Sequence, residues 1–205
     1  MARIVLQAPC VRFRSCKGTR AAMSVFHSAT HRLIDYWRSR ALDGAAPARA
    51  SISPAAFAEL LPQVFILGRT YSGVYPLRLT GGFVSDLHGR DLRRLNGLVL
   101  WAERDRSRLQ TALEEARRRP EPIVALVEAV GETGALGMEI LFAPLAGPDG
   151  EVDRFLGLYQ PLGFTARLQG RPVLSLSLRA LQHAGAANEF VPRLRLATLD
   201  GRHVA

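Results

Sequence analysis

The feature that most limits the possible folds is residues 120–160, where prolines and glycines separate three strand-like segments. Residues 123–130 are apolar on both faces, as expected of a strand that is covered on both sides. The second segment has the period of two that is typical of strands, with apolar side chains at Leu136, Met138, Ile140 and Phe142. A Gly-Pro-Asp-Gly turn at 147–150 leads into residues 152–160, which alternate again. We therefore predict three consecutive antiparallel strands.

An amphipathic helix is predicted over residues 25–42. Its apolar residues recur at spacings of three and four, at Phe26, Ala29, Leu33, Ile34, Trp37 and Ala41. Two partners for this apolar stripe remain open, the chain's own core or a second subunit. A second, short helix begins at Ser53-Pro54, because proline is favoured at the first helical position, and it ends at Pro62.

The segment between the second helix and residue 120 predicts two strands followed by helices. Residues 64–69 and 74–80 have the composition of short strands. Short helical turns follow across residues 82–101, and a longer helix over 105–119 is predicted to begin with Asp105 as its cap. The order is that of an α+β domain with five antiparallel strands and with helices inserted after the second strand.

The charge of the chain is concentrated at its two ends. The net charge is +9, yet residues 1–22 carry five basic side chains without an acid, and residues 166–205 carry six arginines against two acids. A nucleic-acid-binding domain usually carries its basic residues on the fold itself, so this distribution disfavours such a function. We expect a basic arm or an over-long start at 1–22, one domain at 23–165 and a basic tail at 166–205.

Cysteine content and hydropathy point to a cytoplasmic protein. The two cysteines, Cys10 and Cys16, both lie in the N-terminal segment, so a disulfide framework is not expected to hold the fold. No segment approaches the roughly 18 consecutive apolar residues that a membrane-spanning helix requires. We therefore predict no membrane span.

Short motifs in a fixed order along residues 30–162 carry a resemblance to a known family. They are Asp35-Tyr36-Trp37, Pro47 with Arg49, Ser53-Pro54, Leu60-Leu61-Pro62, Arg78-Leu79 with Gly81, Gly89-Arg90-Asp91-Leu92, Phe142-Ala143-Pro144-Leu145 and Asp153-Arg154-Phe155-Leu156-Gly157. Together they resemble the PAS-domain superfamily, and within it a divergent bacterial family of short, stand-alone proteins. The resemblance implies a PAS-like α+β fold with a five-stranded antiparallel sheet, preceded by the amphipathic helix, and it brings no catalytic residues.

One departure from the PAS pattern concerns a turn. After Gly89-Arg90-Asp91-Leu92, PAS-like sequences often place another glycine, whereas this chain continues with Arg93-Arg94. We therefore expect the local turn to differ from that of its relatives.

The candidate binding site is the space between the curved sheet and the inserted helices. Eight apolar residues are expected to line it, either as a ligand pocket or as a filled core: Phe83, Leu87, Trp101, Leu109, Leu113, Met138, Ile140 and Leu156. The ligand is unknown. The helix over 105–119 has no histidine to bind haem and the domain has no cysteine for a covalent flavin bond, so the sequence disfavours both cofactors.

The histidines and serines are the remaining candidates for metal binding and catalysis. His27 and His31 have the spacing of two metal ligands on a helix, but no metal site is expected to be completed around them. Ser175 and Ser177 precede His183 without a Gly-x-Ser-x-Gly motif around them. We therefore expect neither catalytic nor metal-binding residues.

These observations together predict a non-enzymatic regulatory sensor or protein-interaction module of PAS type in bacterial signalling. It is expected to act through a partner, and it is expected to form a homodimer through Tyr36 and Trp37 of the first helix. The alternatives are a nucleic-acid-associated regulator that uses the basic tails and a small enzyme of unrecognised type.

Overall fold

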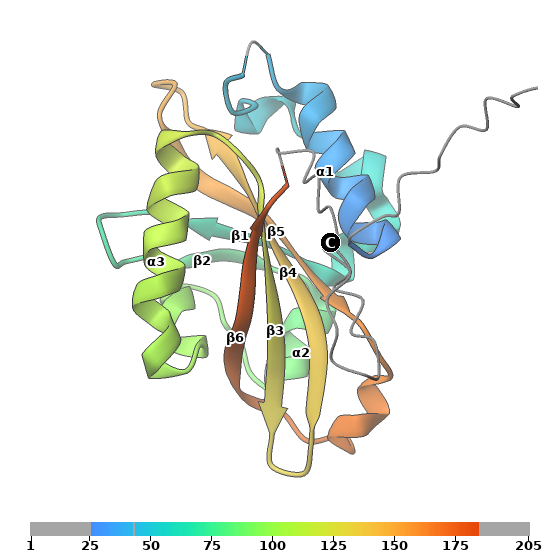
Figure 1. Cartoon of the computed structure of the whole chain (residues 1–205). Helices are drawn as coiled ribbons and strands as arrows, with labels where there is room; N and C mark the ends of the chain where they lie inside the picture. The colour runs from blue at the N-terminus through green and yellow to red at the C-terminus, as the bar shows by residue number, and fades with distance from the viewer. Residues whose placement is uncertain (1–25, 43, 185–205) are drawn as a thin grey trace, which may run out of the picture.

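A computed structural model describes residues 26–42 and 44–184, which form one antiparallel sheet with helices on both faces (Figure 1). The strands lie in the order β2-β1-β5-β4-β3-β6. Their bounds are β1 (Val64–Gly68), β2 (Leu77–Thr80), β3 (Ile123–Gly131), β4 (Ala135–Ala146), β5 (Val152–Pro161) and β6 (Val173–His183). The α+β fold is therefore confirmed, but the expectation of five strands is wrong, because the sheet has six.

The sixth strand corrects the prediction of a C-terminal tail at 166–205. β6 pairs along the whole of β3, and its Leu176 and Leu178 side chains are buried. Asp105 is not the N-cap of α3 as predicted. Its carboxylate instead accepts the backbone N–H of Leu178 in β6 at 2.9 Å. The fold thus continues to residue 184. The arm predicted at 1–22 and the rest of the tail lie outside the described residues.

The helices divide between the two faces of the sheet. On the face that we call inner lie α2 (Gly82–His88), the 3₁₀ helix η3 (Gly97–Leu100) and α3 (Glu103–Arg118). On the outer face lie α1 (Ser28–Arg40) and the 3₁₀ helix η2 (Pro54–Gln63), whose buried residues join a second apolar cluster. Two further 3₁₀ turns are η1 (Arg49–Ser51) and η4 (Thr165–Leu168). None of the helices in the described part of the chain is long and apolar enough to cross a membrane.

The first helix packs on the sheet of its own chain. Leu33, Ile34 and Trp37 are buried against the outer face, and the Trp37 indole N–H donates to the Pro144 carbonyl at 2.6 Å. The helix starts at residue 28 because the His27 side chain accepts the Ala29 N–H, as an N-cap residue does. Of the two partners left open for the apolar stripe, the structure therefore uses the chain's own core.

The role of β6 in stability can be tested with two leucines of that strand. Leu176 is fully buried and Leu174 is 62% exposed. Leu176→Ala should lower the free energy of unfolding by about 2–5 kcal/mol, because it leaves a cavity between the sheet and α3. Leu174→Ala should change it by less than about 0.5 kcal/mol. Urea denaturation of both variants measures this, and equal midpoints for the two would contradict the buried position of β6.

Candidate functional site

Seven of the eight predicted site residues meet on the inner face. Phe83 is partly exposed and packs against an apolar cluster on this face. The other six are buried in that cluster: Leu87, Trp101, Leu109, Leu113, Met138 and Ile140. Leu156 is the exception and belongs to the outer cluster under α1. Its neighbour Phe155 faces inward, and successive side chains of a strand point to opposite faces. The prediction for Leu156 was therefore wrong by one residue of register.

The inner space is filled by the protein's own side chains. The cavity that remains has a volume of about 10 Å³, and ten residues line it: Phe65, Leu67, Leu77, Gly97, Leu98, Leu100, Trp101, Leu109, Phe142 and Tyr159. The Phe65 ring packs edge-on against Phe142 and Tyr159, with centroids 5.6 and 5.4 Å apart. Such a volume holds one water molecule at most.

A haem or flavin does not fit this inner space. Either group is many times larger than the cavity, and the aromatic rings that fill the centre of the space would have to move. The chain's two cysteines, Cys10 and Cys16, lie outside the described residues, so the domain core offers no thiol for a covalent flavin bond. Of the two interpretations of the eight residues, the geometry favours a filled core.

One buried polar group interrupts this apolar core. His88, the last residue of α2, is 6% exposed and its ring lies edge-on to Tyr159, with centroids 5.9 Å apart. Its Nε2 atom has no hydrogen-bond partner. Burial, and secondarily the charge of Arg90, lowers the pKa of His88 from 6.5 to about 4. The imidazole is therefore neutral in the folded protein at neutral pH.

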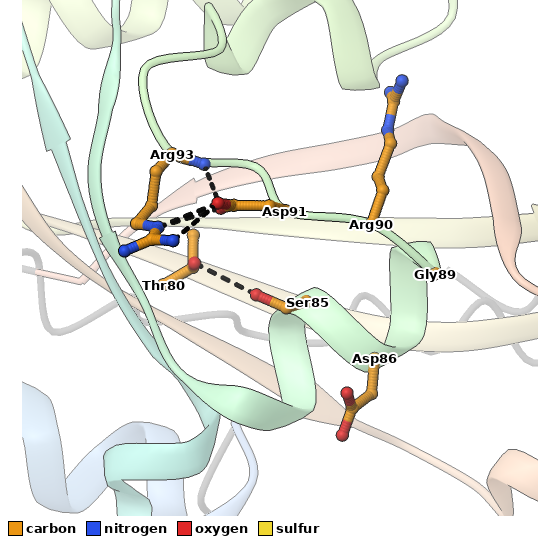
Figure 2. A pocket seen from close by; sticks show the side chains of 7 residues that line it. All are labelled: Thr80, Ser85, Asp86, Gly89, Arg90, Asp91 and Arg93. Atoms are coloured by element: carbon orange, nitrogen blue, oxygen red, sulfur yellow. Dashed lines mark hydrogen bonds and ion pairs between the residues drawn. The ribbon is translucent and has the colours of Figure 1, made fainter.

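Next to His88 the Gly-Arg-Asp-Leu motif forms a polar surface hollow of about 680 Å³ (Figure 2). Asp91 binds the Arg93 guanidinium at 2.7 and 3.0 Å, and this contact lowers the pKa of the carboxyl to about 2. In Figure 2 Arg90 points away from this pair. The hollow carries both charge signs, with its central acid already paired, so it has no evident preference for anions or cations.

The motif itself has a structural role. Gly89 ends α2 with φ 61°, the left-handed conformation that glycine favours, and Leu92 is fully buried. The predicted departure at Arg93-Arg94 lies in the next turn. There Arg94 has φ 67°, and its N–H donates to the Leu77 carbonyl at 2.8 Å. An arginine thus adopts a backbone conformation that is usual for glycine.

A charged cluster behind the inner core was not indicated by the sequence. Glu114 of α3 accepts hydrogen bonds from the Tyr75 hydroxyl at 2.5 Å and the Arg69 Nε at 2.7 Å. Arg117 pairs with its second oxygen at 3.2 Å. Burial alone would raise the pKa of Glu114, but the hydrogen bonds from these partners hold it at about 2. A carboxylate so engaged fastens α3 to the β1–β2 connection and is not free to act as a base.

The two histidines at metal-ligand spacing cap a helix. The buried Glu139 carboxylate of β4 accepts the His27 N–H at 3.0 and 3.1 Å, so the structure does bring an acid to this pair. The ring nitrogens of His27 and His31 instead accept the N–H groups of Ala29 and Phe26. Over residues 26–42 and 44–184, no three acidic, histidine or cysteine side chains are placed to hold a metal ion.

The serines and histidine of β6 do not come together. Arg104 donates to the Ser177 hydroxyl at 3.1 Å. His183 lies six residues along the strand, roughly 20 Å away, beside Glu121 at 3.4 Å. This spacing does not place a base next to a nucleophile.

The aromatic pair predicted as a dimer contact is used within the chain. Trp37 is 5% exposed and packs on the sheet, which corrects its predicted role as a contact between subunits. Tyr36 lies edge-on to Phe57, with centroids 5.2 Å apart, and its hydroxyl accepts the Ser53 N–H at 2.7 Å. Tyr36 keeps a partly exposed side chain beside η2.

Comparison with known proteins adds a family match. A family model described as PAS domain matches residues 25–160. No curated protein sequence matches the chain.

Among solved structures, three that are similar to this chain are light-oxygen-voltage proteins. The structure of a single-residue variant of RsLOV is 18% identical, with a TM-score of 0.43, over 54% of this chain and 66% of that one. The Rhodobacter sphaeroides LOV protein is 13% identical, with a TM-score of 0.41, over 57% and 73%. An RNA-binding light-oxygen-voltage receptor is 16% identical, with a TM-score of 0.44, over 60% and 38%. The chain thus spans just under two thirds of the first of these proteins.

Removal of Trp101 tests how tightly the inner space is filled. Trp101 is 3% exposed between η3 and the sheet, whereas Val99 of the same 3₁₀ turn is 43% exposed. Trp101→Ala should lower the free energy of unfolding by about 3–5 kcal/mol, because the surrounding side chains cannot close the cavity. Val99→Ala should cost less than about 0.5 kcal/mol. Urea midpoints that match the parent for both variants would place Trp101 at the surface.

Acid should destabilise the fold through His88. Folding lowers the pKa of His88. Its contribution to the free energy of unfolding is therefore complete above pH 6.5 and is lost as the pH falls toward 4. Between pH 7.5 and 4.5 the loss should be on the order of 2–3 kcal/mol, whereas Glu114 loses its contribution only below pH 4.5.

Urea denaturation at the two pH values measures this loss. His88→Gln should abolish most of the difference, because glutamine does not titrate. The matched control His183→Gln, at a side chain that is 42% exposed, should retain it. An undiminished acid effect in His88→Gln would show that another group is responsible.

Proposed function

The chain belongs to the PAS domain family, and we propose that it is a non-enzymatic regulatory module that acts by binding another protein. The observation that carries the proposal is the filled inner core. With a cavity of about 10 Å³, the inner core has no room for an organic ligand in this conformation, so the surface of the domain is where it meets its partners.

The state of the polar groups supports a role without catalysis. A general base needs a free lone pair beside a substrate pocket. Glu114 is held by two arginines and a tyrosine, and Glu139 is committed to the start of α1. His88 has a free ring nitrogen, but it is enclosed by apolar side chains.

Self-association is part of the proposed function. The apolar stripe of α1 packs on the sheet of its own chain. A homodimer therefore cannot use Trp37 unless α1 separates from the sheet. Only the partly exposed side of Tyr36 remains for the contact that the sequence indicated. A homodimer of the intact fold therefore needs a further apolar surface.

Native mass spectrometry of the purified full chain tests the proposal. We expect masses of the 22.5 kDa chain or of its multiples, without a bound small molecule. Mild activation in the instrument should release nothing but chains. A stoichiometric small molecule that survives purification would contradict the proposal, because it would show that the inner core opens to hold a ligand.

A further inference from the structure

Residues 162–172, between β5 and β6, are anchored to the domain at one point and are otherwise exposed. The anchor is Leu168 at the end of η4, which is buried in the inner cluster. The Thr133 hydroxyl of the β3–β4 turn donates to the Leu168 carbonyl at 3.4 Å. In Figure 1 this orange segment and the β3–β4 turn lie together at one end of the sheet. Its exposed side chains therefore project from a structured part of the domain.

Two large apolar side chains of this segment face the solvent. Phe164 is 85% exposed, more than any other large apolar side chain in the described part of the chain. Leu162, two residues before it, is 51% exposed. Contact of a phenylalanine with water costs free energy that a binding partner would recover.

Arginines accompany these apolar side chains. The segment contains Arg167 and Arg171 and no acid, so its own charge is +2. The Arg167 N–H donates to the Phe164 carbonyl at 3.1 Å, and residues three apart share a face of a 3₁₀ turn. Phe164 and Arg167 therefore project on the same side of η4.

An acid of the β3–β4 turn offsets little of this charge. Glu132 lies 3.8 Å from the Arg171 guanidinium, and both side chains are more than half exposed. Ion pairs between exposed side chains are weak, so Arg171 stays available to an anionic partner.

The size of the apolar surface favours a membrane over a protein as the partner. A specific protein interface buries about 800 Å² on each partner. A phenylalanine and a leucine offer roughly half of that area even when both are fully exposed. A membrane needs no such area, because apolar side chains enter the boundary between headgroups and acyl chains while anionic headgroups attract arginines beside them. The net charge of the whole chain, +9, acts in the same direction.

We propose that residues 162–171 bind the surface of an anionic membrane. Phe164 and Leu162 enter the headgroup boundary, and Arg167 and Arg171 contact the lipid phosphates. This contact goes beyond the protein binding proposed above, because it places the domain at a membrane surface.

Co-sedimentation of the full chain with vesicles measures this binding. The vesicles consist of phosphatidylcholine, either alone or with about one third phosphatidylglycerol. The parent should bind the anionic vesicles. Phe164→Ser should weaken this binding by about tenfold, because less apolar surface enters the boundary. Arg167→Gln should weaken it by about fivefold, because one headgroup contact is lost.

Each variant has a matched control elsewhere on the domain. Tyr71 is an aromatic residue that is 63% exposed, on the β1–β2 connection beside α3. Arg118 is exposed at the end of α3, near the start of β3, whereas the segment lies near the other end of that strand. Tyr71→Ser and Arg118→Gln should each change the binding by less than about twofold.

Phe164→Trp reports on the surroundings of this side chain in the bound state. Trp37 and Trp101 are both buried, so the added indole should dominate the change in emission on binding. With anionic vesicles the emission should shift to shorter wavelength, and lipids brominated in their acyl chains should quench it. A contact with protein would not give this quenching.

Two results would overturn the proposal. One is a parent chain that stays in solution with both kinds of vesicle, which would leave a protein as the partner of Phe164. The other is binding to anionic vesicles that Phe164→Ser leaves unchanged, which would assign the binding to basic residues elsewhere in the chain.

Discussion

Strands β4 and β5 bury side chains on both faces of the sheet, and the layers around them follow from this double burial. Phe142 and Phe155 face the inner core, while Leu141 and Leu156 face the outer one. An apolar strand surface is stable only under cover, so helices must lie on both faces. Where β4 loses its outward apolar residues, at Glu139 and Gly137, the cover by α1 ends.

The filled inner core and the pairing of the buried acids both favour a function that does not involve catalysis or a bound ligand. The packed rings of Phe65, Phe142 and Tyr159 occupy the space that a ligand would need. The acids that catalysis could use instead hold elements together, as Glu114 does for α3. What remains for function is the surface of the domain.

Much of the candidate site could be predicted because its residues are local in pattern. Trp101, Leu109 and Leu113 stand out as apolar positions on helical segments, and they are buried together. The assignment of Leu156 failed because a shift of one residue along a strand reverses the face of a side chain. The contacts of Glu114 with Tyr75 and of Glu139 with His27 had no sequence signal, since these partners lie 39 and 112 residues away.

The sequence by itself determined the local elements, because the period of apolar residues and the breaks at proline and glycine depend on neighbours along the chain. It determined the helix over 28–40, the β3–β4–β5 meander and the absence of a cysteine in the described domain. Only the tertiary structure decided that residues 173–183 complete the sheet, that the stripe of α1 packs on its own chain, and that the inner space is closed. Those outcomes depend on contacts between residues far apart in the sequence, and the free energy of such contacts cannot be deduced from a local sequence pattern.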